Sequence, residues 1–289
     1  MIPPPFDYHS PKTLPEALEL LGRFGEEAKV LSGGQSLLPL LKLRLAQPAH
    51  VVDIGRIPGL DYIKEEGGML RIGALVREAA LEASSLVRSR YPILVDTAAV
   101  IADPLVRNLA TVCGNLAHGD PANDHPATML ALDAEVVLTG AKGSRTLPVE
   151  RFFTGLFATA LEPAEVLSEI RIPAPPPNSG GAYVKLERKV GDFATAGVAA
   201  FLVLKGGTVE RAGIGLTSVG ATPIKATEAA RSLAGKKASE EAFSEAGRLA
   251  AAAASPSADR RGSVEYKKEM ARVLTIRALR KAAQRAEGR

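Results

Sequence analysis

A segment rich in proline and glycine, PAPPPNSGG at residues 173–181, divides the chain into two parts. Proline stops regular secondary structure and glycine frees the backbone, so elements are interrupted where the two cluster. The chain has 289 residues, enough for two or three domains or subdomains. The segment therefore predicts a domain boundary, and the two parts can be interpreted separately.

The part before the boundary mixes short strands with helices. Thr13 and Glu16 have the spacing of a capping box and begin a helix that Gly25 follows. Gly67 and Gly68 predict the turn of a hairpin. Apolar patterns predict further strands at residues 28–31, 50–55, 135–140 and 144–149, and helices at residues 37–45 and between residues 77 and 100.

The part after the boundary begins with strands and ends with helices. Gly206 and Gly207 form a two-residue hairpin turn between two apolar runs. Strands are predicted at residues 181–190, 197–205 and 209–218, and the alanine-rich remainder is predicted to be helical.

Composition excludes several classes of protein. A single cysteine, Cys113, excludes an internal disulfide framework and a cysteine zinc cluster. Aromatic residues make up only 4% and tryptophan is absent, so few rings are available to stack on nucleic acid bases, and the net charge of +4 is mild. No apolar run reaches the ~18 residues of a membrane span, and the first residues lack a signal-peptide pattern. We expect a cytoplasmic protein without nucleic acid partners.

A first candidate site is Ser32-Gly33-Gly34-Gln35-Ser36, between a predicted strand and a predicted helix. Small residues in such a place can direct several backbone N–H groups at one anion, and a pyrophosphate would suit them. Neither a Walker loop nor the G-x-G-x-x-G dinucleotide pattern is present. An ordinary tight turn is the alternative.

A second candidate site lies in the polar segment at residues 101–127. Thr111, Gly114 and Asn115 predict another turn of small residues. Two carboxylates and two histidines also lie close together in this segment, and they could suggest a metal: His118, Asp120, Asp124 and His125. Their spacing matches no zinc or iron pattern, so we expect no metal. A long loop that satisfies its own backbone is the alternative.

A third candidate site is YVKLERKVGDFATAGVA at residues 183–199. Because side chains alternate along a strand, Tyr183, Lys185 and Glu187 should share one face. A half-exposed strand with solvated charges is the alternative. No Ser-His-Asp or Cys-His set can be defended, so we expect no catalytic side chain and chemistry supplied by a cofactor.

Together the three segments carry a resemblance. SGGQSLLP, TVCGNLAHGDPANDHPA and KxxRKxGDFA occur in this order, with FDYHSPKTLPEALELL before them and RIPAPP at the boundary. The chain resembles the FAD-binding medium subunits of molybdenum hydroxylases over residues 2–283. Within this family it is most similar to the medium subunits of aerobic carbon monoxide dehydrogenases.

The resemblance implies an α+β fold. A PCMH or vanillyl-alcohol-oxidase type FAD-binding domain would span residues 1–176, with subdomains at about 1–58 and 59–176. A C-terminal domain with a small antiparallel sheet and helices, like that of carbon monoxide dehydrogenase flavoproteins, would span residues 177–289. FAD would lie between the domains.

The resemblance also implies the residues that bind FAD. The backbone of the first segment would wrap the pyrophosphate, the second segment would form another clamp, and Asp124 would hold the polar middle of the cofactor. Lys185 would lie near the isoalloxazine, and Phe193 would stack beside it at a position that is often tyrosine. The full set is Ser32, Gly33, Gly34, Gln35, Ser36, Leu37, Ile101, Ala102, Thr111, Gly114, Asn115, Ala117, Asp124, Leu167, Lys185 and Phe193.

Cys113 departs from the glycine that the family usually has at this position. If the position requires a positive φ, strain of about 1 kcal/mol or more is expected. If it does not, Cys113 simply packs. A redox role for the thiol is the less favoured alternative.

As a function, the resemblance implies an electron-transfer subunit. A large molybdopterin subunit would oxidise the substrate, and a small iron–sulfur subunit would pass the electrons through FAD to an acceptor such as a quinone. The assembly would be a dimer of heterotrimers, in the cytoplasm or at the inner face of the membrane. The alternatives are the flavin subunit of a related aldehyde, purine or heterocycle hydroxylase, an independent flavin oxidoreductase of the same superfamily, and a scaffold subunit that has lost its flavin.

Overall fold

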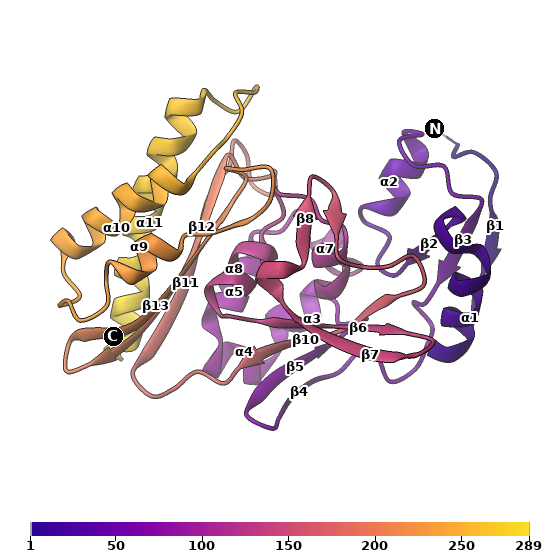
Figure 1. The fold of residues 1–289 in the computed structure, drawn as a ribbon, viewed down its shortest axis with the longest axis horizontal. Helices are drawn as coiled ribbons and strands as arrows, with labels where there is room; N and C mark the ends of the chain where they lie inside the picture. The colour runs from indigo at the N-terminus through magenta and orange to yellow at the C-terminus, as the bar shows by residue number, and fades with distance from the viewer. Residues whose placement is uncertain (1, 289) are drawn as a thin grey trace.

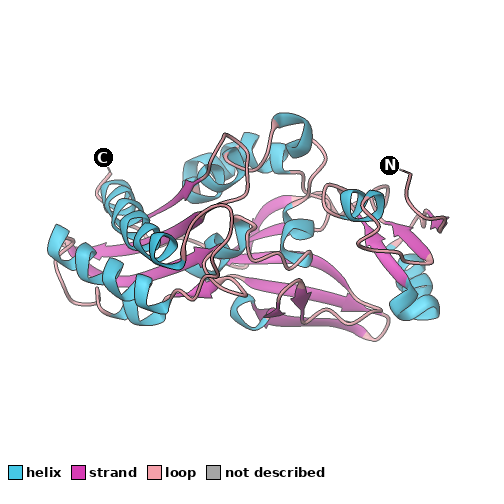
Figure 2. Ribbon diagram, turned by 90° about the horizontal axis from the view of Figure 1, so that it is seen from above, coloured by secondary structure: helices cyan, strands magenta, loops and turns pink. Residues whose placement is uncertain are grey.

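In the computed structural model of the protein, residues 2–288 are described and form three units along the long axis of the molecule. The N-terminus lies at one end of this axis and the C-terminus at the other (Figures 1 and 2). No helix among these residues is both long enough and apolar enough to cross a membrane.

The N-terminal unit is a small parallel sheet with one covering helix. The sheet has the order β1-β3-β2, and both pairings are parallel. Thr13 Oγ1 accepts a hydrogen bond from Glu16 N at 3.3 Å, which caps α1 as the sequence predicts. The elements of this unit are β1 (Asp7–His9), α1 (Leu14–Phe24), η1 (Gly25–Glu27), β2 (Ala28–Leu31), α2 (Leu37–Lys42) and β3 (His50–Asp53).

The middle unit is an antiparallel sheet with the order β4-β5-β10-β6-β7 and six helices. Its strands are β4 (Ile63–Glu66), β5 (Met69–Gly73), β6 (Glu135–Gly140), β7 (Gly143–Pro148), the hairpin of β8 (Phe153–Gly155) with β9 (Ala158–Thr159), and β10 (Val166–Pro173). The helices are α3 (Glu78–Ala83), α4 (Ser85–Arg90), α5 (Pro92–Ala99), α6 (Pro104–Arg107), α7 (Val112–Ala117) and α8 (His125–Ala131), with the short η2 (Val149–Arg151).

The C-terminal unit is an antiparallel sheet covered by helices on its outer face (Figure 2). The predicted hairpin turn is confirmed, since Gly206 and Gly207 have φ values of 58° and 78°. The elements are β11 (Ser179–Leu186), β12 (Ala196–Lys205), β13 (Thr208–Thr217), β14 (Ile224–Lys225), α9 (Thr227–Arg231), α10 (Glu240–Ala253) and α11 (Val264–Ala286).

Strand β12 is buried on both faces and belongs to two cores. Phe201 and Val203 on one face pack into the core of the middle unit, which also contains side chains of α5 and α8. Leu202 and Leu204 on the other face pack against the side of the sheet that α10 and α11 cover. The result is a stack of sheet, helices, sheet and helices, and the α+β class with an antiparallel C-terminal sheet is confirmed.

The sequence patterns missed some features of this fold. They gave no signal for β10, although this strand lies between β5 and β6 in the sheet. The predicted strand at residues 181–190 ends earlier, at Leu186. Gly180 and Gly181 lie within β11 and not in a free linker, because α11 packs against the strand where a side chain at Gly180 would lie 2.2 Å from Ala282 O.

Candidate functional site

The first glycine-bearing bend follows β2 and leads into α2. Gly34 has a φ of 74°, a left-handed conformation that glycine adopts without strain. At Gly33 the reason for glycine is different. A Cβ atom there would lie 2.3 Å from Leu109 O and 2.8 Å from Ala110 Cα. The missing side chain at Gly33 therefore admits another part of the chain.

The second bend, predicted as a turn, is in fact the beginning of helix α7. Thr111 is the N-cap of this helix, and its Oγ1 accepts a hydrogen bond from Gly114 N at 3.2 Å. A Cβ atom at position 114 would lie 2.5 Å from the same oxygen, so the cap requires glycine there. Asn115 follows in the first turn of the helix.

The two bends lie against each other although about 80 residues separate them. Ser32 Oγ and Thr111 Oγ1 are 2.9 Å apart, within hydrogen-bond distance, and Gly33 packs on the backbone at residues 109–110. We call residues 32–36 together with residues 109–115 the cradle. The sequence predicted both bends, and the structure shows that they meet.

The cradle offers polar groups that the described part of the protein does not satisfy. The backbone N–H groups of residues 33–36 have no acceptor within residues 2–288. Asn115 Oδ1 is buried and has no hydrogen-bond partner there either. A buried polar atom without a partner, such as Asn115 Oδ1, is costly unless a ligand or water completes it. Donors for phosphate oxygens and an acceptor for a hydroxyl are what the pyrophosphate and ribityl parts of FAD require, so the residues present fit this cofactor.

Asp124, the predicted contact to the middle of the cofactor, lies in a buried ionic cluster. Its Oδ1 accepts a hydrogen bond from the Tyr183 hydroxyl at 2.5 Å, and its Oδ2 lies 3.2 Å from Lys185 Nζ. Burial raises the pKa of the Asp124 carboxyl, although Lys185 and Tyr183 oppose the shift. Burial, together with the charge of Asp124, also raises the pKa of the Tyr183 phenol.

Lys185 is the centre of this cluster and is not a solvated strand charge. Its side chain is only 2% exposed, and Nζ donates to Val100 O at 2.7 Å and to Asp192 O at 3.0 Å. It also forms an ion pair with Glu187 at 3.2 Å. Lys185 thus ties the loop after α5 to the loop before β12. The alternative of an exposed charged strand is wrong at this position.

The two loops that Lys185 joins carry three more of the predicted residues. Ala102 has a φ of 45°, and a Cβ atom at Gly191 would lie 2.4 Å from Ala102 O, so the loops touch through their backbones. Ile101 is buried beside this contact, whereas Phe193 is 48% exposed. A flat, exposed aromatic ring is available for stacking, but its contact with the isoalloxazine stays a prediction.

The remaining predicted residues take different places. Leu37 is the first residue of α2, and Ala117 is the last residue of α7; both are half-buried. Leu167 lies in β10 beside a bulge and is 4% exposed, within the core of the middle unit. The protein core already explains the packing of Leu167, so its contact with FAD stays a prediction.

The histidines and aspartates that suggested a metal site each contact a different partner. His125 is fully buried, with Nε2 2.7 Å from Glu78 Oε2, whereas the ring of His118 lies beside Phe157. Asp120 Oδ1 accepts a hydrogen bond from Ala122 N. No cluster of three potential metal ligands is found within residues 2–288. No sequence pattern indicated the buried pair of Glu78 and His125. Strand alternation placed Tyr183 on the same face as Lys185 but did not indicate its hydrogen bond to Asp124.

Cys113 lies inside helix α7 and needs no positive φ, so the expected strain is absent at this residue. Its side chain is buried, and Sγ lies 3.6 Å from Gly73 O and 3.7 Å from Ile72 O. Burial raises the pKa of the thiol well above its ordinary value. Cys113 therefore packs the helix onto the sheet and is poorly suited to thiolate chemistry.

Comparisons with known families match the two parts of the chain separately. The model of the FAD binding domain in molybdopterin dehydrogenase matches residues 4–175. The model of the CO dehydrogenase flavoprotein C-terminal domain matches residues 181–282.

The relatives cover almost the whole chain. The carbon monoxide dehydrogenase medium chain of Hydrogenophaga pseudoflava is 48% identical over 98% of both chains. The 6-hydroxypseudooxynicotine dehydrogenase complex subunit alpha of Paenarthrobacter nicotinovorans is 37% identical over 99% of this chain and 97% of its own length.

Solved structures give the same result. Carbon monoxide dehydrogenase from Hydrogenophaga pseudoflava superimposes with a TM-score of 0.96, at 49% identity over 99% of each chain. Quinoline 2-oxidoreductase from Pseudomonas putida 86 superimposes with a TM-score of 0.93, at 34% identity over 99% of each chain.

Proposed function

The chain belongs to the family of FAD-binding medium subunits of molybdenum hydroxylases, and from this premise we propose that it is the flavin subunit of an aerobic carbon monoxide dehydrogenase. Membership makes it an FAD-dependent oxidoreductase subunit. The proposal adds the substrate of the complex, the electron route and the acceptor. Identity is higher to the carbon monoxide dehydrogenase medium chain than to the relative named for 6-hydroxypseudooxynicotine, which favours carbon monoxide.

The observation that carries the proposal is the contact between the two bends of the cradle. The free amide groups of residues 33–36 can neutralise a diphosphate through backbone dipoles alone. Asn115 Oδ1 would accept a hydrogen bond from a hydroxyl of the cofactor, because it is buried without another partner. Ser32 and Thr111 would hold the two bends together around it.

Bound FAD stores two electrons and thereby connects a one-electron donor to a two-electron acceptor. The chain itself binds and orients the cofactor, and its residues perform no acid or base step on the substrate. The cluster around Lys185 keeps both flanking loops in place. The electrons would come from a small iron–sulfur subunit, and a large molybdopterin subunit would oxidise the substrate.

The finer parts of the proposal concern the acceptor and the assembly. We propose a quinone as acceptor and a dimer of heterotrimers as the assembly, in the cytoplasm or at the inner face of the membrane. Several relatives carry names that describe them as subunits or chains of larger enzymes, which supports partner subunits here.

The test is to co-express the full chain with the proposed molybdenum and iron–sulfur partner subunits. The purified complex should bleach its visible flavin absorbance on addition of carbon monoxide and recover it on addition of a quinone analogue. Bleaching by an aldehyde, a purine or a quinoline instead would assign a related hydroxylase. Turnover of a small organic substrate by the isolated chain would favour an independent flavin oxidoreductase.

A matched pair of variants separates the cradle from the assembly. The complex with Gly33→Val should retain molybdenum and iron–sulfur clusters but contain no flavin, because the new side chain meets Leu109 O and separates the bends. The complex with Gly22→Ala should retain all cofactors, since a Cβ atom at Gly22 has no neighbour within 4 Å. Stoichiometric flavin in the Gly33→Val complex would refute the proposal that the cradle binds FAD.

A further inference from the structure

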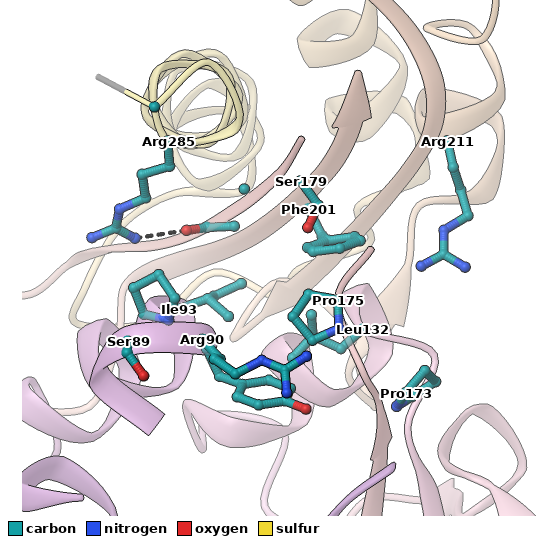
Figure 3. Close-up of a pocket in the computed structure, with 15 residues that line it drawn as sticks. Ser89, Arg90, Ile93, Leu132, Pro173, Pro175, Ser179, Phe201, Arg211 and Arg285 are labelled. Atoms are coloured by element: carbon teal, nitrogen blue, oxygen red, sulfur yellow. Dashed lines mark hydrogen bonds between the residues drawn. The ribbon is translucent and has the colours of Figure 1, made fainter. Parts of the chain in front are cut away.

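A cavity of about 300 Å³ lies between the middle unit and the C-terminal unit (Figure 3). Its walls come from the junction of α4 and α5, the linker after β10, strands β11 and β12, and the end of α11. None of its lining residues belongs to the cradle. The cavity is therefore a separate feature, and the proposed function gives it no role.

Part of the cavity wall is apolar. Figure 3 shows Phe201, Ile93 and Pro175 around it, from three different elements. Strand β11 contributes the backbone of Gly180 and Gly181 to the wall, where α11 and Ile93 pack against the two glycines. A ring or another flat apolar body can contact Phe201 here, as aromatic pairs do in protein cores.

Three arginines surround the cavity, and within residues 2–288 one of them, Arg211, has no carboxylate partner. Arg285 is held by Asp96 through two contacts of 2.6 and 3.0 Å, and Arg90 is paired with Glu65. Arg211 has no such partner in the part of the chain that the structure describes, and its Cζ lies 5.6 Å from the ring centroid of Phe201.

The positive charge of Arg211 therefore has no carboxylate to balance it among the described residues. Among the described lining residues there is no aspartate or glutamate, and the guanidinium of Arg211 faces only the ring of Phe201. Arginine binds carboxylates through two parallel hydrogen bonds, which gives both affinity and a fixed orientation. Small-molecule sites usually combine apolar walls with a few oriented polar groups, and the volume of this cavity is at the lower end of their range.

We propose that the cavity binds a small aromatic carboxylate, with its ring against Phe201 and its carboxylate on Arg211. The ligand would lie at the junction of the two units, so it would contact both at once. This inference does not depend on the identity of the hydroxylase substrate.

The test uses 2-naphthoate as the probe and the full chain saturated with FAD, so that the flavin site is not available to the probe. Isothermal titration calorimetry should show saturable binding to one site. The neutral analogue 2-naphthamide should bind at least about tenfold more weakly, because it cannot form the charged pair with Arg211.

The variants are Arg211→Gln and, as a matched control, Lys205→Gln. Both residues are exposed and lie in the hairpin of β12 and β13, and each substitution removes one positive charge, but Lys205 does not line the cavity. Arg211→Gln should weaken binding at least about tenfold, and Lys205→Gln should leave it unchanged. The proposal is overturned by equal affinity of Arg211→Gln and wild type, or by no saturable binding below about 10 mM.

Discussion

The replacement of Lys185 by methionine should destabilise the protein in a way that depends on pH. Methionine keeps most of the side-chain volume but removes the charge that faces Asp124 and the donors that reach Val100 O and Asp192 O. The side chains of Lys185 and Asp124 are both more than nine-tenths buried. Breaking a buried pair in this way costs about 3–5 kcal/mol of unfolding free energy.

The direction of the pH dependence follows from the Asp124 carboxyl. Burial raises the pKa of this group in the folded protein, and Lys185 is the largest influence that opposes the rise. Without Lys185 the pKa should rise further, so the folded state binds a proton that the unfolded state releases. Stability is then lost as the pH rises through the folded-state pKa. The loss caused by Lys185→Met should therefore be larger at about pH 8 than at about pH 5.

Urea unfolding at the two pH values measures this effect. Lys189→Met is the control, since Lys189 is exposed in the neighbouring loop and should change stability by less than about 0.5 kcal/mol. Asp124→Asn in the Lys185→Met background should recover part of the loss, because it removes the uncompensated charge. Equal losses at both pH values, together with no recovery in the double variant, would refute the reasoning.

Three further substitutions or reactions test the cradle and its surroundings. Gly33→Ala should lower both FAD affinity and thermal stability because its Cβ meets Leu109 O, whereas Gly22→Ala in α1 should leave FAD affinity unchanged; equal cofactor titrations of the two would contradict the packing. Thr111→Val should cost about 1–2 kcal/mol in urea unfolding through loss of the helix cap, and Thr111→Ser should restore most of it. Cys113 should react with a disulfide reagent only after denaturation, because its thiol is buried with a raised pKa; rapid reaction in the native protein would contradict this.

Local elements could be predicted from the sequence because their signals are local. The cap at Thr13 and the turn at Gly206–Gly207 depend on residues that lie next to each other in the chain. Strand β10 gave no comparable signal, and its place between β5 and β6 is decided by pairing with distant segments.

The candidate site was predictable in its parts but not in its connections. The bends at Gly33 and Thr111 carry recognisable residues, yet the contact between them depends on the tertiary fold. Alternation along a strand indicates which side chains share a face, but not what covers that face. It therefore cannot show whether Lys185 is solvated or buried. The structure shows that Asp124 and Tyr183 cover it.

Two glycines of β13, Gly213 and Gly215, pack directly against α8, and this contact affects how the whole chain folds. A Cβ atom at Gly213 or Gly215 would lie 2.0 Å from a carbonyl oxygen of α8, so helix and strand touch along their main chains. Rotation of one unit against the other would drive these backbones together, which leaves no room for a hinge. We therefore expect a single cooperative melting transition for the full chain, and aggregation of a fragment that ends at the proline-rich segment and leaves α5 and α8 uncovered.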